Sequence, residues 1–381
     1  AHHLGLRSTL VDVTFTTVSI GHQTSVEEPV LSMTRHVTQR ETDFADLTAV
    51  DHVVSQLLAD EITRDEAASR IAQISSSGHP RPRWSITAGW GITGAGVALL
   101  LGGDWIVLLI AALAGSAVEV LQRRIARFRL PFFYSQAAGG LLSTLIAVVL
   151  AATDIPVDPS TVVTAGIIML LAGLGFIGAF QDALTGFYVT ANARILEVVI
   201  ATIGIIVGVS AGLSIGTWMG VTVQIDPPSS LGLSDVVGIV AGAAITAAGF
   251  AFTAYAPARS IAPIAAIGAA SAAVYFVLIQ HGVGRAAAAG VAALIIGLVS
   301  YSAAGWSRVP PLVIIVSCIV PLLPGLSIYR SLALLAQDNY AGLLAMITAV
   351  GVAIALSSGA ILGEYIAQPL RREARRLEQR L

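Results

Sequence analysis

The sequence has 381 residues, of which 55% are hydrophobic and 12% charged, and its formal net charge is −2. Soluble domains carry about 25% charged residues, so this composition excludes an ordinary soluble protein and predicts a membrane protein. All 21 basic residues are arginine. Because lysine is absent, the chain cannot be a standard P-loop ATPase or form a Schiff base with a substrate. The single cysteine, Cys318, excludes internal disulfides and a cysteine-rich zinc site, and we expect neither a cofactor nor a metal.

Residues 1–83 lack long apolar runs and are expected to form a small α+β domain on the cytoplasmic side. The β-forming residues at 11–20 and 30–38, separated by a polar turn, indicate a pair of strands. Two helices follow, one over about 47–59 and one that begins after the cap-like Thr63. The opening stretch lacks the apolar core of a secretory signal peptide. Because the sequence begins with alanine rather than methionine, we expect a further segment upstream.

From residue 84 onward, apolar segments alternate with short polar loops, and each segment is long enough to cross a bilayer, which takes about 20 residues. We expect a membrane all-α region of ten spans in two repeats of five, residues 84–225 and 226–381, the second ending in a basic tail. An odd number of spans inverts the second copy relative to the first. The predicted spans are 86–103, 105–122, 132–153, 161–180, 192–216, 235–254, 261–280, 285–304, 309–335 and 342–366.

The fourth and ninth predicted spans are interrupted by glycine or proline at matching places. The fourth contains Gly173 and Gly175, and the ninth contains Pro321 and Pro324 followed by Gly325. Proline removes a backbone donor and glycine weakens a helix, so both spans are expected to break near the middle of the bilayer. Backbone groups freed in this way hold small substrates in secondary transporters; a simple packing kink is the alternative.

The distribution of arginine predicts the orientation. With the N-terminal domain inside, the cytoplasmic side receives 19 arginines and the far side receives two, Arg285 and Arg330. Cytoplasmic loops carry the excess of basic residues, so both termini are expected in the cytoplasm of a bacterial cell, with the spans in its plasma membrane. The arginine clusters at 123–129 and 371–380 then serve topology and lipid contact rather than nucleic-acid binding.

The most polar stretch near the membrane, residues 181–197, joins the fourth and fifth spans. Asp182 and Glu197 are candidates for proton coupling, because a charged residue inside a helical bundle is costly and commonly marks an ion or substrate path. Arg194 lies three residues before Glu197 and is expected to share a helix face with it and pair with it. Thr185 supplies a hydroxyl for a zwitterionic ligand. An ordinary solvated loop is the alternative.

A glycine stripe along the fifth span allows close approach of another helix, either within one bundle or between two subunits of a homo-oligomer. The same span contains a GxSxG match around Ser210, but a hydrolase needs this motif on a strand-to-helix elbow, which a spanning helix does not provide. Three carboxylates near span ends are expected to be solvated or at the lipid interface. The stripe is Gly204, Gly208, Gly212, Gly216 and Gly220, and the carboxylates are Asp104, Glu119 and Glu364.

With these motifs in this order, the chain resembles the threonine/serine exporter family over nearly its whole length. The resemblance implies export of L-threonine and L-serine across a bacterial plasma membrane, driven by the proton-motive force. Ala172 and Gln181 depart from the family pattern, since many members have proline and arginine there. The matching positions are Asp182, Thr185, Gly186, Arg194 and Glu197 in the first half and Pro321, Pro324 and Gly325 in the second.

We therefore expect a proton-coupled antiporter rather than an enzyme, with the substrate held between the two broken spans during alternating access. Its partners are a small amino acid, protons and membrane lipid. Asp182 or Glu197 would take the proton or the substrate ammonium, and Arg194 or backbone amides at Gly325 would take the carboxylate. The remaining residues of the expected substrate site are Thr185, Asn192, Pro324 and Tyr329.

Three alternatives remain open at this point. A dicarboxylate exporter is associated with relatives whose two halves are separate chains, and it would need more cationic groups near the site than Arg194 and Arg330 provide. An intramembrane hydrolase would use Ser210. A receptor or scaffold would need only one membrane anchor, so ten spans with paired breaks argue against it.

Overall fold

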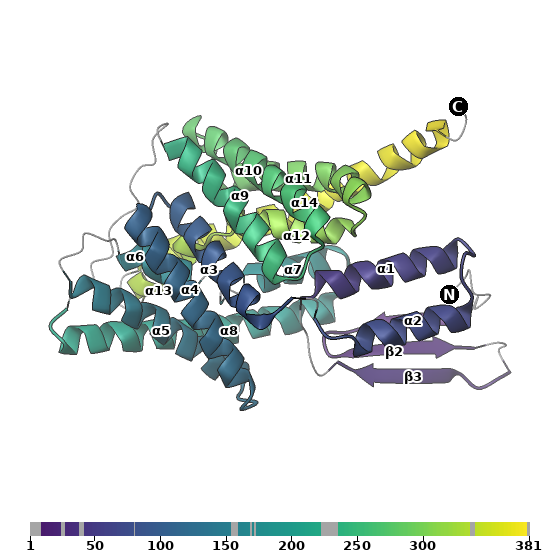
Figure 1. The fold of residues 1–381 in the computed structure, drawn as a ribbon, viewed down its shortest axis with the longest axis horizontal. Helices are drawn as coiled ribbons and strands as arrows, with labels where there is room; N and C mark the ends of the chain where they lie inside the picture. The colour runs from purple at the N-terminus through teal and green to yellow at the C-terminus, as the bar shows by residue number, and fades with distance from the viewer. Residues whose placement is uncertain are drawn as a thin grey trace.

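The computed structural model describes residues 9–23, 27–37, 42–79, 81–153, 159–167, 170, 173–221, 235–335 and 340–378. A small N-terminal sheet and two helices lie at one end of a large helical bundle (Figure 1). This end of the bundle is called the near end below, and the opposite end is called the far end.

The N-terminal sheet has three antiparallel strands, β1 (Thr9–Val13), β2 (Thr17–His22) and β3 (Leu31–His36), in the order β1-β2-β3. The sequence predicted one strand over 11–20, and this was wrong because a tight turn divides that stretch. The N–H of Thr14 donates to the carbonyl of Thr17 at 2.8 Å, and the two hydroxyls are 2.6 Å apart. Threonine favours strands by propensity, but these hydroxyl contacts stabilise a turn instead.

Two capped helices follow the sheet, α1 (Phe44–Leu58) and α2 (Arg64–Ser76). The side chain of Asp43 accepts from the N–H groups of Ala45 and Asp46 at 2.8 and 2.9 Å, so α1 begins three residues before the predicted start. The hydroxyl of Thr63 accepts from the N–H of Glu66 at 3.3 Å, as expected for the cap of α2.

Most of the chain from Arg83 onward is helical. Seven of the described helices are long and apolar enough to cross a membrane: α4, α5, α8, α9, α10, α11 and α14. The count of ten spans stays a prediction. The long helices are α3 (Arg83–Leu100), α4 (Trp105–Ala126), α5 (Phe132–Ala151), α8 (Tyr188–Trp218), α9 (Val236–Thr253), α10 (Ala258–Gln280), α11 (Arg285–Ser307) and α14 (Ala341–Glu378).

The fourth and ninth segments are each built from shorter helices. The fourth consists of α6 (Pro159–Ile167) and α7 (Gly173–Leu184). The ninth consists of α12 (Pro311–Ile319), a 3₁₀ turn at Val320–Leu322, and α13 (Gly325–Leu335).

The two halves of the bundle use matching helix pairs. In the first half α3 contacts α4 and α5 contacts α8, and in the second half α9 contacts α10 and α11 contacts α14. The later helix of each broken segment also crosses to the other half, α7 to α14 and α13 to α8. The repeat of five segments and the inversion of its second copy stay predictions.

Four glycines of the stripe, Gly204, Gly208, Gly212 and Gly216, lie against α5 of the same chain, whereas Gly220 lies beyond the end of α8 with φ +77° and no atom within 4 Å of an added Cβ. An added Cβ at Gly204 would lie 2.7 Å from the carbonyl oxygen of Phe133, and one at Gly212 would lie 2.7 Å from Cβ of Thr144. At Gly208 it would overlap the carbonyl oxygen of Ala137. The stripe therefore brings two helices of one bundle together, as small residues do in membrane helix pairs.

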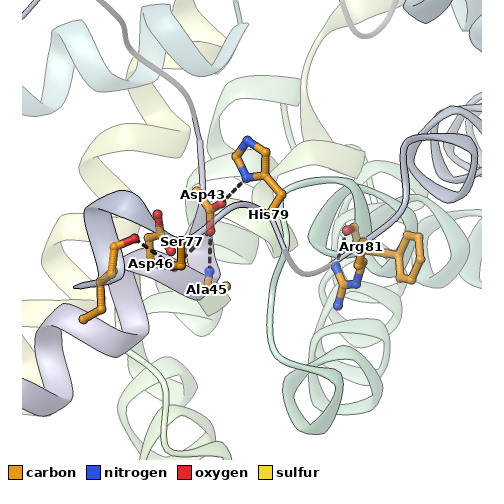
Figure 2. A network of polar contacts seen from close by, with 8 residues as sticks. Asp43, Ala45, Asp46, Ser77, His79 and Arg81 are labelled. Atoms are coloured by element: carbon orange, nitrogen blue, oxygen red, sulfur yellow. Dashed lines mark hydrogen bonds and ion pairs between the residues drawn. The ribbon is translucent and has the colours of Figure 1, made fainter. Parts of the chain in front are cut away.

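The N-terminal domain is anchored to the near end by Phe44, whose side chain is 3% exposed and belongs to the main core of the bundle. Its ring meets Phe250 of α9 edge-on with centroids 6.3 Å apart, and its N–H donates to the carbonyl of Ala254 at 2.8 Å. Figure 2 shows the neighbouring polar contacts, in which His79 bonds to Asp43 at 2.8 Å and Arg81 points toward the helices.

Candidate functional site

A cavity of about 680 Å³ opens at the far end of the bundle. It is lined by the last turn of α3, the beginning of α9, the end of α10, the beginning of α11 and the first turns of α14. The opposite ends of these helices lie at the near end. α9 ends beside Phe44, and at the end of α11 the carbonyl of Arg308 accepts a 3.0 Å hydrogen bond from the ring Nε2 of His52 in α1. The cavity and the N-terminal domain therefore lie at opposite ends.

Both broken segments contribute to the cavity wall. Thr164 of α6 lines it three residues before α6 ends, and the whole stretch Val320–Gly325 between α12 and α13 lines it as well. The polar side chains among the described lining residues come from five helices. They are Thr164, Tyr275, Gln280, Arg285, Ser327 and Thr348.

The backbone of the break in the ninth segment lies in this cavity wall, where the N–H of Gly325 donates to the carbonyl of Leu323 at 2.7 Å. Leu323 is extended, with φ −60° and ψ 136°, and neither Pro321 nor Pro324 has an N–H. The carbonyl end of α12 and the N–H end of α13 thus meet in one wall. The first end attracts cations and the second attracts anions, so together they suit a zwitterion.

Asp182 and Arg194 form an ion pair across the turn between α7 and α8, with Nε and Oδ2 2.8 Å apart. Both atoms are shielded from solvent and neither makes an aligned hydrogen bond, so Coulomb attraction holds the pair. The guanidinium also lies 5.8 Å from the ring centroid of Phe15 in the N-terminal domain. Asp182 is thus an acidic partner of Arg194, and the predicted pairing of Arg194 with Glu197 stays a prediction.

The predicted site residues are divided between the two ends. Pro321, Pro324 and Gly325 line the cavity at the far end. The α7–α8 cluster lies at the near end, where the hydroxyl of Thr190 contacts the carbonyl of Val13 at 3.5 Å. Thr185 and Asn192 of this cluster are exposed, and Glu197 is half-buried. Gly175 packs on α8. The side chain of Tyr329 lies outside the described part of the structure.

Thr185 uses its hydroxyl locally. It donates to the carbonyl of Gln181 at 2.9 Å and contacts that of Asp182 at 3.2 Å, which closes the end of α7. In this conformation the residue terminates a helix and does not line the cavity.

Glu119 is buried, in contrast to the solvated position expected from the sequence. Its side chain accepts a 2.6 Å hydrogen bond from Thr87 of α3 and pairs with Arg123 at 3.1 Å. The packing of α3 on α4 encloses it. The spacing of four residues between Glu119 and Arg123 was the available sequence signal for the pair. Asp104 caps the N-terminus of α4. The carboxylate of Glu364 accepts a hydrogen bond from the hydroxyl of Tyr301 at 3.0 Å.

Comparison with known proteins identifies the family. A threonine/serine exporter (ThrE) family model matches residues 1–216, and a second, described as "Threonine/Serine exporter, ThrE", matches residues 239–366. The chain belongs to the threonine/serine exporter family. No solved structure is significantly similar to it.

Two relatives of this exporter family member cover nearly its whole length. One is the "Probable threonine/serine exporter" of Mycobacterium tuberculosis, 32% identical over 380 residues, which are 98% of this chain and 72% of the relative. The other is the "Threonine/serine exporter" of Corynebacterium glutamicum, 32% identical over 378 residues, which are 97% of this chain and 77% of the relative. Family membership and the apolar helices together show an exporter-type membrane protein.

Proposed function

We propose that this chain is a secondary transporter that exports L-threonine and L-serine by alternating access, driven by the proton-motive force. It lies in the bacterial plasma membrane with both termini in the cytoplasm, so the near end faces the cytoplasm and the far end faces outward. The names of the two relatives support the substrates, and the arginine distribution supports the orientation.

The observation that carries the proposal is the cavity at the junction of the two broken segments. Its volume of about 680 Å³ falls within the usual range for small-molecule sites, which is about 300–1,000 Å³. The wall is mainly apolar, with hydroxyls from Thr164, Ser327 and Thr348. A hydroxy amino acid needs such hydroxyl partners as well as the paired helix ends at Val320–Gly325 for its ammonium and carboxylate.

The conformation supports one state of an alternating cycle. The cavity opens at the far end, while Phe44 fills the near end beneath the N-terminal domain. Export then requires a second state in which the near end opens and the far end closes around the same broken segments.

Proton coupling is assigned to Asp182 and Glu197 at the near end. Protonation of Asp182 removes the negative charge that holds Arg194, which frees the guanidinium and loosens its contact with Phe15. Because these residues lie away from the cavity in this state, protons and substrate act on opposite ends of the bundle. The variant Asp182→Asn/Glu197→Gln should lose gradient-driven transport; export at the wild-type rate would contradict the assignment.

The experiment that tests the function is uptake of labelled L-threonine into proteoliposomes, with and without an imposed pH gradient. L-serine and succinate serve as competitors. Accumulation that needs the gradient and is blocked by serine alone supports the proposal. Competition by succinate alone would instead indicate a dicarboxylate exporter, and threonine movement that ignores the gradient would remove the proton coupling.

A serine hydrolase is disfavoured by the position of Ser210. The residue lies in the middle of the continuous helix α8, where its carbonyl accepts from the hydroxyl of Ser214 at 2.9 Å. A nucleophile elbow needs a sharp strand-to-helix turn. The variant Ser210→Ala should therefore transport threonine like the wild type.

A further inference from the structure

We infer that Arg285 is the residue that recognises the substrate carboxylate in the far-end cavity. This inference rests on the proposed function and identifies the carboxylate as the part of the substrate that the cavity recognises. Among the described residues that line the cavity, Arg285 is the one with a charged side chain. Arg194, for which the sequence suggested this role, lies at the other end of the bundle.

Two general rules disfavour an arginine at this position. Arg285 is the first residue of α11, where the positive end of the helix dipole repels a cation. It also lies on the side of the bundle that carries only two of the 21 arginines, so the topology does not need it. Neither helix stability nor orientation accounts for this residue, whereas a negatively charged ligand in the cavity does.

The surroundings leave the guanidinium available to a ligand. Within the described part of the chain no acidic side chain lines the cavity or forms an ion pair with Arg285. Arg285 is exposed at the mouth of the cavity, with Tyr275 and Gln280 of α10 among the other lining residues. Arginine presents a planar fork of donors that matches a carboxylate in two parallel hydrogen bonds, so this cation also orients the substrate.

The test compares L-threonine with L-threoninamide, which replaces the carboxylate by a neutral group of similar shape. Uptake is measured from the far end in proteoliposomes. The wild type should prefer threonine by roughly 10-fold or more, since hydrogen bonds to charged groups contribute roughly 1.5–3 kcal/mol. R285Q should reduce this preference to about one while leaving threoninamide uptake within about two-fold of the wild type. R285K should keep part of the preference, because its charge remains but its fork is lost.

Arg83 provides a matched control, since it is also an exposed arginine at the first position of a helix but lies at the near end. R83Q should keep the preference for threonine. If the wild type does not move threonine at all, the proposed function fails. If the wild type moves threonine and R285Q still prefers it over threoninamide as strongly, only the role of Arg285 fails.

A second variant keeps the test decisive should R285Q fold poorly. Cys318 is the single native cysteine and is fully buried, so a cysteine at position 285 would react alone with thiol reagents. R285C labelled with a positively charged methanethiosulfonate should regain the preference for threonine, and the same variant labelled with a neutral reagent should not. Equal preference after both reagents would overturn the inference.

An independent set of contacts carries a second inference: we propose that the N-terminal domain is the latch that keeps the near end closed. The latch is defined here as Phe44, His79 and Arg81. Phe44 is buried in the bundle core, and the ring of His79 stacks on Tyr255 with centroids 4.5 Å apart. The guanidinium of Arg81 donates to the carbonyls of Phe252 and Ala256, at the end of α9 and just beyond it, and lies 4.3 Å from the ring centroid of Phe252.

These latch contacts join the domain to the second half of the bundle, while Phe15 and Val13 contact the α8 side of the first half. The domain therefore bridges both halves at the end that must open. Burial lowers the pKa of Arg81, and Tyr255 and Asp43 act in the opposite direction. For the two halves to separate, the domain must lose either its latch contacts with the second half or its contacts with the α8 side of the first half.

A reversible cross-link tests the latch in the full chain. The backbone groups of Phe44 and Ala254 are hydrogen-bonded at 2.8 Å, so the pair F44C/A254C is placed for a disulfide. Oxidation should abolish threonine transport and leave thiol labelling of a cysteine at Ser327 in the cavity unchanged, and reduction should restore the activity of that same sample. Undiminished transport after complete oxidation would overturn the proposal.

A single substitution provides the complementary measurement. F44A should raise the labelling rate of a cysteine at Ser357, a buried residue whose hydroxyl contacts the carbonyl of Ile177 in the same core as Phe44. The control L58A changes an exposed residue on the same helix and should not alter this rate. An equal labelling rate in F44A and L58A would contradict the latch even if the double-cysteine variant were inactive when reduced.

Discussion

The two ends of the bundle differ although the two halves use matching helix pairs. At the near end, the ring of Phe250 packs edge to face with Phe44 and with Trp90, at centroid distances of 6.3 and 6.2 Å. At the far end, the broken segments leave a cavity of about 680 Å³. The N-terminal domain packs on the near end through Phe44, and nothing equivalent is seen at the far end within the described residues. This contact distinguishes the two ends of the bundle.

The largest expected effect comes from separating α8 from α5, because the glycines of α8 pack directly on α5. G208V places a side chain where the carbonyl oxygen of Ala137 already lies, so the helices must move apart. We expect loss of the folded transporter, seen as failure to elute as a single species in detergent. In the control G351A the nearest atom to the new Cβ lies 4.0 Å away, and the protein should fold normally. Normal folding of G208V would show that α5 and α8 are packed differently.

The next largest effect is expected from the variant F44A and should be confined to the near end. F44A removes a buried aromatic ring from the core, which typically costs about 3–5 kcal/mol. Much of this cost should appear as release of the N-terminal domain, so limited proteolysis should cut the linker before α3 faster than in the wild type. Threonine-induced protection of a cysteine at Ser327 should remain. L58A, which changes an exposed residue, should be cleaved like the wild type.

A smaller effect is expected from the buried Glu119. E119Q keeps the shape but leaves Arg123 without its charge partner, and because Arg123 is about one-third exposed the loss should be about 1 kcal/mol. It should lower the melting temperature in detergent by a few degrees. R123Q should give a similar decrease, and the double variant should cost less than the sum of the two. Additive losses would mean that the pair does not interact.

The smallest effect should come from the N-terminal domain away from the bundle. T63A removes the hydroxyl that caps α2, a change that typically costs about 1 kcal/mol. Hydrogen exchange should increase in the first turn of α2, while transport and the labelling of the cavity stay unchanged. An effect of T63A on transport would show that α2 takes part in the closure that the structure assigns to α1 and the linker.

Several local features follow from the sequence because they depend on neighbouring residues. Thr63 caps α2 as expected, since the hydroxyl and its N–H partner are three residues apart. The ninth segment divides at Pro321 and Pro324, where a helix loses hydrogen bonds whatever surrounds it. In the fourth segment α7 begins at Gly173, whereas Gly175 lies inside that helix. The Thr14–Thr17 turn was missed because β-forming residues run through it and its hydroxyl contacts overrule their propensity.

The candidate site was predicted only in part. Pro321, Pro324 and Gly325 line the cavity, since the break itself forms the wall. The sequence placed Arg285 on the far side of the membrane but did not connect it with the ninth segment. It also grouped Arg194 with the substrate, although the fold holds Arg194 beside Asp182 and Phe15 at the other end. Both points concern which distant residues meet, and the roles assigned to Arg194 and Arg285 stay predictions.

The sequence by itself determined that this is an apolar helical membrane protein of the threonine/serine exporter type, with two interrupted segments and a small capped N-terminal domain. Composition, helix caps and helix-breaking residues act within a few positions along the chain, so they can be read locally. Only the tertiary structure decided that Phe44 packs into the bundle core, that Glu119 is buried, and that Thr164, Arg285 and Ser327 share a cavity. These contacts join residues from different helices, and their partners are chosen by packing and burial rather than by local sequence.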